Sequence, residues 1–369
     1  MKHVMNVSAE SLRVFIRSVL LAWGMPAPDA EITTDLLVET DLRAIDSHGV
    51  SMLPMYEQML HQGMLCMTPA RSTVRDAPSL ALIDAGRGLG HPVARAAMLM
   101  ACDKARLCGI AAVGVRNSHH FGAAGLYAEL AADQGLLGFV TSSTSVAGVL
   151  PAGGAVPLMG TNPLAFSAPG GRHGPFLLDM STSTVAVNKI KVHAFKGLDL
   201  PYGWVFDEHG EPVYDSQKAL AICLAQKKGG LSPLGISTET GGHKGYGLAG
   251  MVQILSSALT GGSFSPSRNL KGDKRAPHNI GHFFMAIDPA AFREPGELEH
   301  DLEEMTDMLA ASPPSCNGKP VKVPGDPERD AREDRKRNGI PIPPDLLEKL
   351  SLIARNAGVD DLSAYGAQA

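Results

Sequence analysis

The sequence has few cysteines, and their arrangement points neither to cross-links nor to zinc. The five cysteines are odd in number and scattered, and no two form a Cys-x-x-Cys pair: Cys66, Cys102, Cys108, Cys223 and Cys316. Neither a disulfide framework nor a zinc knuckle is indicated, and we expect the thiols to be reduced.

The sequence also lacks an excess of positive charge and a long apolar segment. Its 33 Lys and Arg residues against 38 Asp and Glu give a net charge of −5, which argues against a surface for nucleic acid or an anionic membrane. No stretch approaches the length of about 18 apolar residues that a membrane span needs. The opening MKHVMNVSAE does not lead into the apolar core of a signal peptide. We therefore expect a cytoplasmic protein with no membrane partner and no nucleic-acid partner.

The motifs of common hydrolases are absent as well. The 13 histidines invite a metal interpretation, but the chain contains no His-Glu-x-x-His motif. It also contains no Gly-x-Ser-x-Gly nucleophile elbow. We predict no metal site and no serine hydrolase chemistry.

What the chain has in abundance is glycine and proline, 40 and 26 residues, as many ligand-binding α/β proteins do. Its 369 residues are enough for two to three domains. Ser8 and Asp29 are positioned to cap two early helices, and the alternating charges of 328–337 predict a solvated helix face. Hydrophobic periodicity is helical at both ends of the chain and alternates between strand and helix in the middle. We predict a discontinuous helical domain from 1–75 and 300–369, and an α/β domain over 76–299 that divides near residue 118.

The segment GRGLGH, after the predicted strand LALIDA, imitates a dinucleotide-binding turn. A Rossmann fingerprint needs glycine at its first, third and sixth positions. Gly86 and Gly88 fit, but His91 stands at the sixth position, and the next strand brings no acidic residue for a ribose. An ordinary glycine turn is the better interpretation.

The segment DSHG lies between two predicted helices, where irregular backbone often carries function. His48 follows Ser47, and an imidazole whose ordinary pKa is about 6.5 suits proton transfer near neutral pH. Asp46 either bonds this ring or caps the next helix.

A second histidine motif, NSHHFGAAG, follows a predicted apolar strand. On extended backbone His119 and His120 point to opposite faces, so one of them can face a cleft. The small residues 122–124 then allow a ligand to approach the amides at a helix start. In GGHKGYG, His243 and Lys244 also precede a predicted helix; either the lysine contacts a phosphate there, or the segment is a plain loop.

Six segments stand in an order that is more specific than any one of them: DLRAIDSHGV, VRNSHHFGAAGLYA, MGTNPLAFSAP, FLLDMSTS, GGHKGYGLA and HFFMAIDPAAF. On these segments the chain resembles the malate/L-lactate dehydrogenase family of oxidoreductases, which lacks a Rossmann domain. The resemblance covers roughly residues 8–358. It implies an α/β (α+β) fold, with a non-Rossmann nicotinamide-binding domain built on a mixed sheet and a helical domain from both chain ends. It also implies NAD or NADP as cofactor and a homodimer with the active site near the subunit interface.

The resemblance also implies roles for individual residues. In the family, the histidine that matches His48 exchanges a proton with the substrate and the serine that matches Ser47 assists; His120 corresponds to the base in some members and to a cofactor contact in others. The implied cofactor-binding residues are His120, Phe121, Gly122, Ala123, Ala124, Asp179, Met180, Ser181, His243, Lys244, Gly325 and Asp326. The substrate-side residues are Tyr56, Met52, Thr161 and Lys189.

Two positions depart from the family pattern. Members commonly read SHGVxRLP, with an arginine that can clamp a substrate carboxylate, whereas this chain has Met52 there. That departure puts lactate and malate in doubt as substrates and favours a substrate with an apolar or bulky group. Where imine-reducing members carry an aspartate, this chain has Lys189, which is suited to contact an acidic substrate.

The function favoured by the sequence is reversible hydride transfer between a 2-hydroxy acid and its 2-oxo acid, with NAD or NADP and a histidine proton carrier. One alternative is an NADPH-dependent reductase of a cyclic imino acid. Another is a catalytically silent relative that binds nucleotide, which the joint presence of His48, His120 and Lys244 argues against.

Overall fold

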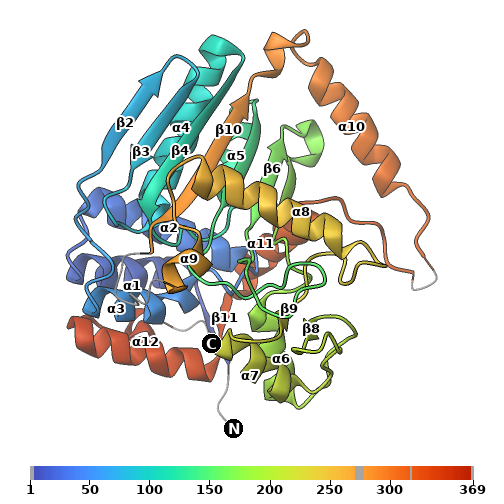
Figure 1. The fold of residues 1–369 in the computed structure, drawn as a ribbon. Helices are drawn as coiled ribbons and strands as arrows, with labels where there is room; N and C mark the ends of the chain where they lie inside the picture. The colour runs from blue at the N-terminus through green and yellow to red at the C-terminus, as the bar shows by residue number, and fades with distance from the viewer. Residues whose placement is uncertain (1–3, 271–277, 316–317, 367–369) are drawn as a thin grey trace.

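The computed structural model describes residues 4–270, 278–315 and 318–366 (Figure 1). It contains a seven-stranded sheet at the centre, helices from both chain ends on one side, and a smaller lobe on another side.

The central sheet is mixed and mostly antiparallel, which confirms the predicted fold class. Only the pair β3–β4 is parallel, and every other neighbouring pair is antiparallel. In spatial order the strands are β2 (Ser72–Ala77), β3 (Leu80–Asp84), β4 (Ile110–Ser118), β10 (Ile280–Ile287), β5 (Leu137–Ser142), β6 (Leu164–Ala168) and β7 (Phe176–Met180). A Rossmann sheet is mostly parallel, so the weak fingerprint at GRGLGH is correctly interpreted as a turn.

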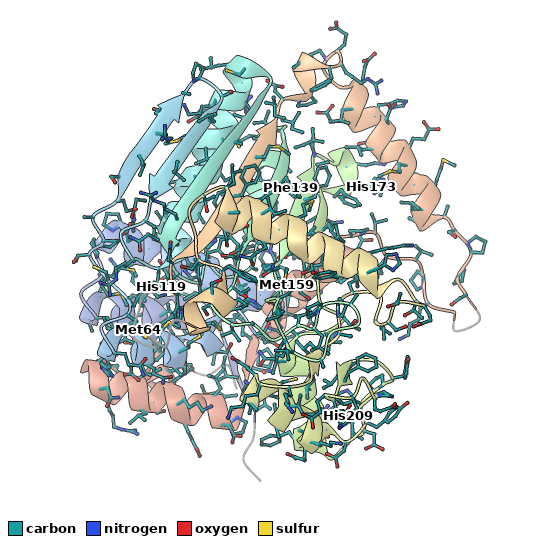
Figure 2. The ribbon with its side chains drawn as sticks, viewed as in Figure 1. Met64, His119, Phe139, Met159, His173 and His209 are labelled. Carbon is teal, nitrogen blue, oxygen red and sulfur yellow. The ribbon has the colours of Figure 1, made fainter. Side chains whose placement is uncertain are left out.

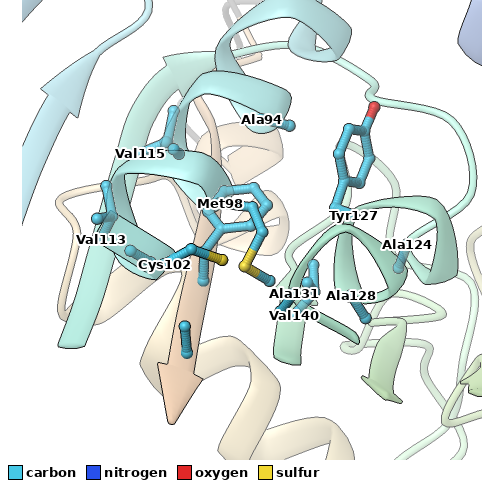
Figure 3. Packing of buried hydrophobic residues seen from close by; sticks show 14 of the residues in the cluster. Ala94, Met98, Cys102, Val113, Val115, Ala124, Tyr127, Ala128, Ala131 and Val140 are labelled. Atoms are coloured by element: carbon cyan, nitrogen blue, oxygen red, sulfur yellow. The ribbon is translucent and has the colours of Figure 1, made fainter. Parts of the chain in front are cut away.

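Helices α4 (Gly90–Cys108) and α5 (Gly125–Ala132) cover one face of the sheet and form a hydrophobic core with it. The buried side of α4 is small, with Ala94, Ala97, Ala101 and Ala105 at helical spacing. Such a face allows the helix to lie close to the valines of β4, and Met98 fills the space toward α5 (Figure 3).

Helix α8 (Gly242–Gln253) and the π-helical turn η3 (Ile254–Ala258) cross in front of the opposite face (Figure 1). The hydroxyl groups of Thr141 on β5 and Ser256 on η3 are joined by a 2.7 Å hydrogen bond. Short helix α9 (Ser265–Leu270) follows.

The smaller lobe has its own core, which runs from Val149 to Ala249. It contains α6 (Val187–Lys196), α7 (Ser216–Ala225) and the strand pair β8 (Val205–Phe206) and β9 (Gly230–Leu231). His209 marks this lobe in Figure 2.

The two ends of the chain share a third core. It joins α1 (Ala9–Ala22), α2 (Ala27–Leu42), α3 (Leu53–His61) and α12 (Pro344–Ala357), and β1 (Met5–Val7) pairs with β11 (Ile340–Ile342). Ser8 caps α1 as predicted, accepting from the Ser11 amide at 3.0 Å. The cap predicted at Asp29 is wrong, because α2 begins two residues earlier, after Pro26.

Three details bear on the predicted domains. Helix α10 (Glu297–Ala310) contributes nothing to the core of the chain ends and instead contacts the 3₁₀ turn η2 (Gly171–His173). The sheet core is continuous across residue 118, and the core of the smaller lobe begins only at Val149. The charged helix α11 (Asp326–Asn338) is solvated, but its Arg332 and Arg335 also bond to α2 and the segment after it.

Candidate active site

The candidate site lies at one edge of the central sheet. Strands β4 and β5 end at this edge with Ser118 and Ser142, and the antiparallel strands β10 and β6 begin there with Ile280 and Leu164. Since loops leave the sheet at this edge, side chains from distant parts of the sequence meet there.

A cavity of about 160 Å³ lies at this edge, between the sheet and the helices of the chain ends. It brings together predicted residues from three separate motifs, DSHG, NSHHFGAAG and MGTNPLAFSAP. Its lining is His48, Met52, Met55, Met59, His120, Phe121, Gly122, Ser142, Ser143, Thr144, Ser145, Thr161, Pro163, His278 and Ile280.

The DSHG segment is held in place by a buried carboxylate that the sequence did not single out. Asp41, near the end of α2, is 2% exposed and accepts a 2.7 Å hydrogen bond from the amide of Val50. A Cβ atom on Gly49 would lie only 2.0 Å from Oδ1 of Asp41. Only glycine fits at this position, and the close packing fixes the backbone that carries His48.

His48 is oriented by its neighbour in the sequence. The Nδ1 atom of its ring lies 2.7 Å from the hydroxyl of Ser47. Both interpretations offered for Asp46 are wrong, because its carboxylate pairs with Arg335 of α11. Ser47 therefore orients the ring, and Asp46 ties the segment to the C-terminal helices.

Hydrogen bonds at Nδ1 hold the ring of His120 in place. The Tyr56 side chain is fully buried, and its hydroxyl lies 2.6 Å from Nδ1 of His120. The amide of Gly122, which has a φ of +81°, donates to the same nitrogen at 3.3 Å. The rings of His48 and His120 are stacked, with centroids 5.3 Å apart and an interplanar angle of 25°.

Burial keeps these groups neutral. It lowers the pKa of His48, and burial together with the neighbouring histidines lowers the pKa of His120 well below its ordinary value. Burial also raises the pKa of Tyr56, so its hydroxyl keeps its proton. The cavity therefore presents two neutral imidazoles at pH 7.

Two further histidines lie close to this pair. His282 on β10 is bonded on both ring nitrogens, to Ser142 at 2.8 Å and Ser118 at 3.0 Å, and stacks on Phe121 at 4.4 Å. His91 is 1% exposed, and within the described ranges neither of its ring nitrogens has a hydrogen-bond partner. Burial lowers the pKa of each to about 3. Both were missed as part of the site, although the segments that contain them, GRGLGH and HFFMAIDPAAF, had been singled out.

The adjacent histidine His119 points elsewhere, as expected for neighbours on extended backbone. Its Nε2 atom lies 2.8 Å from the carbonyl oxygen of Met64, and its ring lies 5.2 Å from that of His278 (Figure 2). The backbone of this histidine pair is held by the GRGLGH turn, because the Gly90 amide donates to the His120 carbonyl at 2.9 Å.

The helix start after NSHHFGAAG is already bonded within the protein. Asp179, at the end of β7, accepts from the Gly125 amide at 2.7 Å. Burial raises the pKa of this carboxyl to about 6, with Glu328 contributing in the same direction. Ala123 and Ala124 are buried beside it. Asp179 therefore already binds the Gly125 amide, which belongs to the helix start that the sequence suggested as a binding site for a ligand anion.

The remaining predicted residues lie outside the cavity lining. Tyr56 and Ser47 do not line the cavity themselves but bond to His120 and His48, which do. Ser181, after Met180 at the end of β7, bonds to Ser183 at 3.2 Å. The others lie on three separate elements: Lys189 on α6, His243 and Lys244 at the start of α8, and Gly325 and Asp326 at the start of α11. Gly325 borders a second cavity of about 280 Å³, lined by Arg43, Glu129, Asp133, Leu177, Gly325, Glu328, Arg329 and Arg332.

Sequence reasoning missed part of the cavity wall. Met55 and Met59 follow Met52 at helical spacing on α3, a periodicity that the resemblance to known motifs had obscured. The hydroxyl side chains of 142–145 lie at the last residue of strand β5 and in the loop directly after it, where a residue is expected to meet a site.

Burial of Asp41 should make stability depend on pH. Its pKa is raised from 3.8 to about 8, chiefly by burial. Between about pH 4 and 8 the unfolded chain loses this proton while the folded chain keeps it, so stability falls as pH rises. Above the folded-state pKa this contribution to stability is lost completely.

The Asp41→Asn variant, whose amide oxygen can still accept from Val50, should show a flatter dependence of melting temperature on pH between 5 and 8. The exposed Asp103→Asn variant is the control and should follow the unmodified protein. Equal slopes for Asp41→Asn and the unmodified protein would contradict the assignment.

The described ranges contain neither a cluster of metal-binding side chains nor a helix fit to cross a membrane. No three or more His, Cys, Asp and Glu side chains among the described residues are grouped so that they could hold a metal ion. In the same part of the chain, no helix combines the length and apolarity that crossing a membrane requires.

Comparison with known proteins agrees with this geometry. The family model for malate/L-lactate dehydrogenase matches residues 7–351. A malate dehydrogenase of Pyrococcus abyssi is 38% identical over 362 residues, which cover 98% of this chain and 97% of the relative. A (2R)-3-sulfolactate dehydrogenase (NADP(+)) of Chromohalobacter salexigens is 33% identical over 359 residues, covering 97% and 96%. The crystal structure of malate dehydrogenase from Entamoeba histolytica superposes with a TM-score of 0.92 at 28% identity, covering 97% of this chain and 99% of that one.

These matches define an oxidoreductase that acts on a CH–OH group. The chain belongs to the malate/L-lactate dehydrogenase family.

Proposed function

We propose that this protein interconverts a 2-hydroxy acid and the corresponding 2-oxo acid with NAD or NADP. The observation that carries the proposal is the pair of stacked, neutral imidazoles of His48 and His120 on one cavity wall. Oxidation of a hydroxyl group needs one group to accept its proton and another to hold the oxygen, and two imidazoles at this spacing can divide those tasks.

The residues around the cavity fit a nicotinamide cofactor. Asn162, between the lining residues Thr161 and Pro163, is fully buried, and its Oδ1 atom has no hydrogen-bond partner among the described residues. That oxygen is the acceptor that a carboxamide N–H needs. Gly122 is also on the lining, and its φ of +81° and the 3.0 Å between an added Cβ atom and Nε2 of His91 require glycine there. When bound, the cofactor supplies the hydride acceptor or donor.

The hydrogen bonds divide the proton chemistry between the two histidines. The Gly122 amide can only donate, so Nδ1 of His120 is an acceptor and the ring proton lies on Nε2. Protonated Tyr56 donates to the same atom. His120 is thus held as a hydrogen-bond donor that orients the substrate oxygen. His48 can donate from Nδ1 to Ser47 and keep a lone pair on Nε2, which takes the hydroxyl proton during oxidation and returns it during reduction.

The direct test is a panel of 2-oxo acids and cyclic imines, each assayed with NADH and NADPH by the loss of reduced-cofactor absorbance. Turnover of at least one 2-oxo acid is expected. Turnover of imines alone would identify a cyclic imino acid reductase instead. Binding of cofactor without turnover of any compound would identify a silent relative.

Lys244 is proposed to contact the cofactor rather than the substrate. It lies exposed in the first turn of α8, where a cation and the helix amides together favour a phosphate. We expect Lys244→Ala to weaken NADH or NADPH binding, measured by fluorescence titration, about tenfold, the loss of one charged hydrogen bond. The Michaelis constant for the substrate should change far less. Lys218→Ala, an exposed lysine on α7, is the control, and unchanged cofactor affinity in Lys244→Ala would contradict the role.

We also propose that the protein is a homodimer with the active site near the subunit interface. Support comes from the outer face of α8 and η3, where Tyr246, Met251, Ile254 and Leu259 are 38–63% exposed. An apolar face of this kind on one continuous helical segment is typical of a protein–protein interface. The same segment begins with Lys244, which brings the interface close to the proposed cofactor contact. Sedimentation should give twice the 38.8 kDa chain mass.

A further inference from the structure

Three methionines, from the 3₁₀ turn η1 (Val50–Met52) and the helix α3 that follows it, form one wall of the candidate active site. Met52, Met55 and Met59 are spaced by three and four residues, which places them on one face of the helical segment. All three are half-buried and line the cavity that holds His48 and His120. We call these three side chains the methionine wall.

The methionine wall is connected to the reacting groups. Tyr56 stands on the same helix between Met55 and Met59, and its hydroxyl bonds to His120 at 2.6 Å. The helix that fixes the orientation of His120 therefore also sets the distance between this ring and the wall. A substrate whose oxygen is held by His120 has part of its carbon chain next to the methionines.

We propose that the methionine wall receives the side chain of the substrate, and that the preferred substrates are 2-oxo monocarboxylic acids with apolar side chains. The inference rests on the proposed function. Thioether side chains are apolar, unbranched and polarisable, so they adapt to aliphatic and aromatic groups of different shape. They offer no donor to a second carboxylate, whose burial against them would be strongly unfavourable.

A homologous series of substrates measures this contact directly. Pyruvate, 2-oxobutanoate, 2-oxopentanoate and 2-oxohexanoate differ by one methylene at each step. Burial of each methylene is expected to raise kcat/KM about fourfold until the wall is covered. Oxaloacetate and 2-oxoglutarate should react more slowly than monoacids of the same chain length. A flat or falling series, or a preference for the diacids, would overturn the proposal.

Variants locate the effect on the wall. Met55→Gln and Met59→Gln keep the length of the side chain and add a polar amide, so each should reduce the gain per methylene. Met52→Arg should raise the turnover of oxaloacetate and lower that of 2-oxohexanoate. Met308→Gln, on the exposed face of α10, is the control and should keep the slope of the unmodified enzyme.

The outcomes distinguish a failure of the proposed function from a failure of the methionine-wall proposal. If no 2-oxo acid reacts with either cofactor, the proposed function is wrong and the inference falls with it. If 2-oxo acids react but kcat/KM does not depend on chain length, the proposed function stands and the methionine wall does not select the substrate. Because the series uses the unmodified protein, the result does not depend on whether a variant folds.

Discussion

Turnover by the His48→Asn variant is expected to fall about 10² to 10⁴-fold, the usual effect of removing a positioned general acid or base. The Nε2 atom of His48 is the group proposed to exchange a proton with the substrate oxygen, and asparagine has no basic nitrogen to replace it. Cofactor affinity should stay nearly unchanged. Steady-state turnover and fluorescence titration of the cofactor measure the two effects separately.

The pH profile of turnover shows whether His48 or His120 carries the proton. In the direction of alcohol oxidation, turnover by the unmodified enzyme should fall on the acid side as His48 becomes protonated. Burial lowers the pKa of this ring, so the fall should lie below the ordinary histidine value of 6.5. This ionisation should disappear in His48→Asn and persist, with a shift, in His120→Asn. If it persists in His48→Asn and disappears in His120→Asn, the two roles are reversed.

The Gly49→Ala variant should lose both stability and activity. The added Cβ would lie 2.0 Å from a carboxylate oxygen of buried Asp41, so the DSHG segment must move away from α2. Overpacking of this kind costs about 3 kcal/mol. Because His48 and Ser47 precede this glycine directly, the movement should also misplace the proton carrier. Thermal melting and turnover are the two measurements.

A double-mutant cycle tests whether the clash with Asp41 causes the loss of stability in Gly49→Ala. Asp41→Ala removes the carboxylate, so adding Gly49→Ala to it should cost much less than adding Gly49→Ala to the unmodified protein. Gly148→Ala is the control, because a Cβ there meets no atom within 4 Å and the backbone is outside the left-handed region. Equal costs in both backgrounds would mean that the clash with Asp41 is not the cause.

The sequence by itself determined the elements and the chemical types of the site. The strand and helix periodicities around LALIDA and GIAAVGVR reappear as β3, α4 and β4. Local features such as the cap at Ser8 and the junction at DSHG depend on neighbours within a few residues, so they can be predicted from the chain alone. The six ordered motifs were sufficient to indicate the family, which the comparisons establish.

Only the tertiary structure decided which of these residues meet. Tyr56 and His120 are 64 positions apart in the chain but 2.6 Å apart in space, and the antiparallel order of β4, β10 and β5 brings Ser118 and Ser142 to the same ring, His282. The role of Asp41 was also hidden, because a carboxylate on a helix near the chain surface looks solvated until its neighbours are known. Contacts between distant segments depend on strand order and helix packing, which local sequence does not specify. The residue types of this site could therefore be predicted from the sequence, while the hydrogen bonds that orient its two histidines came from the fold.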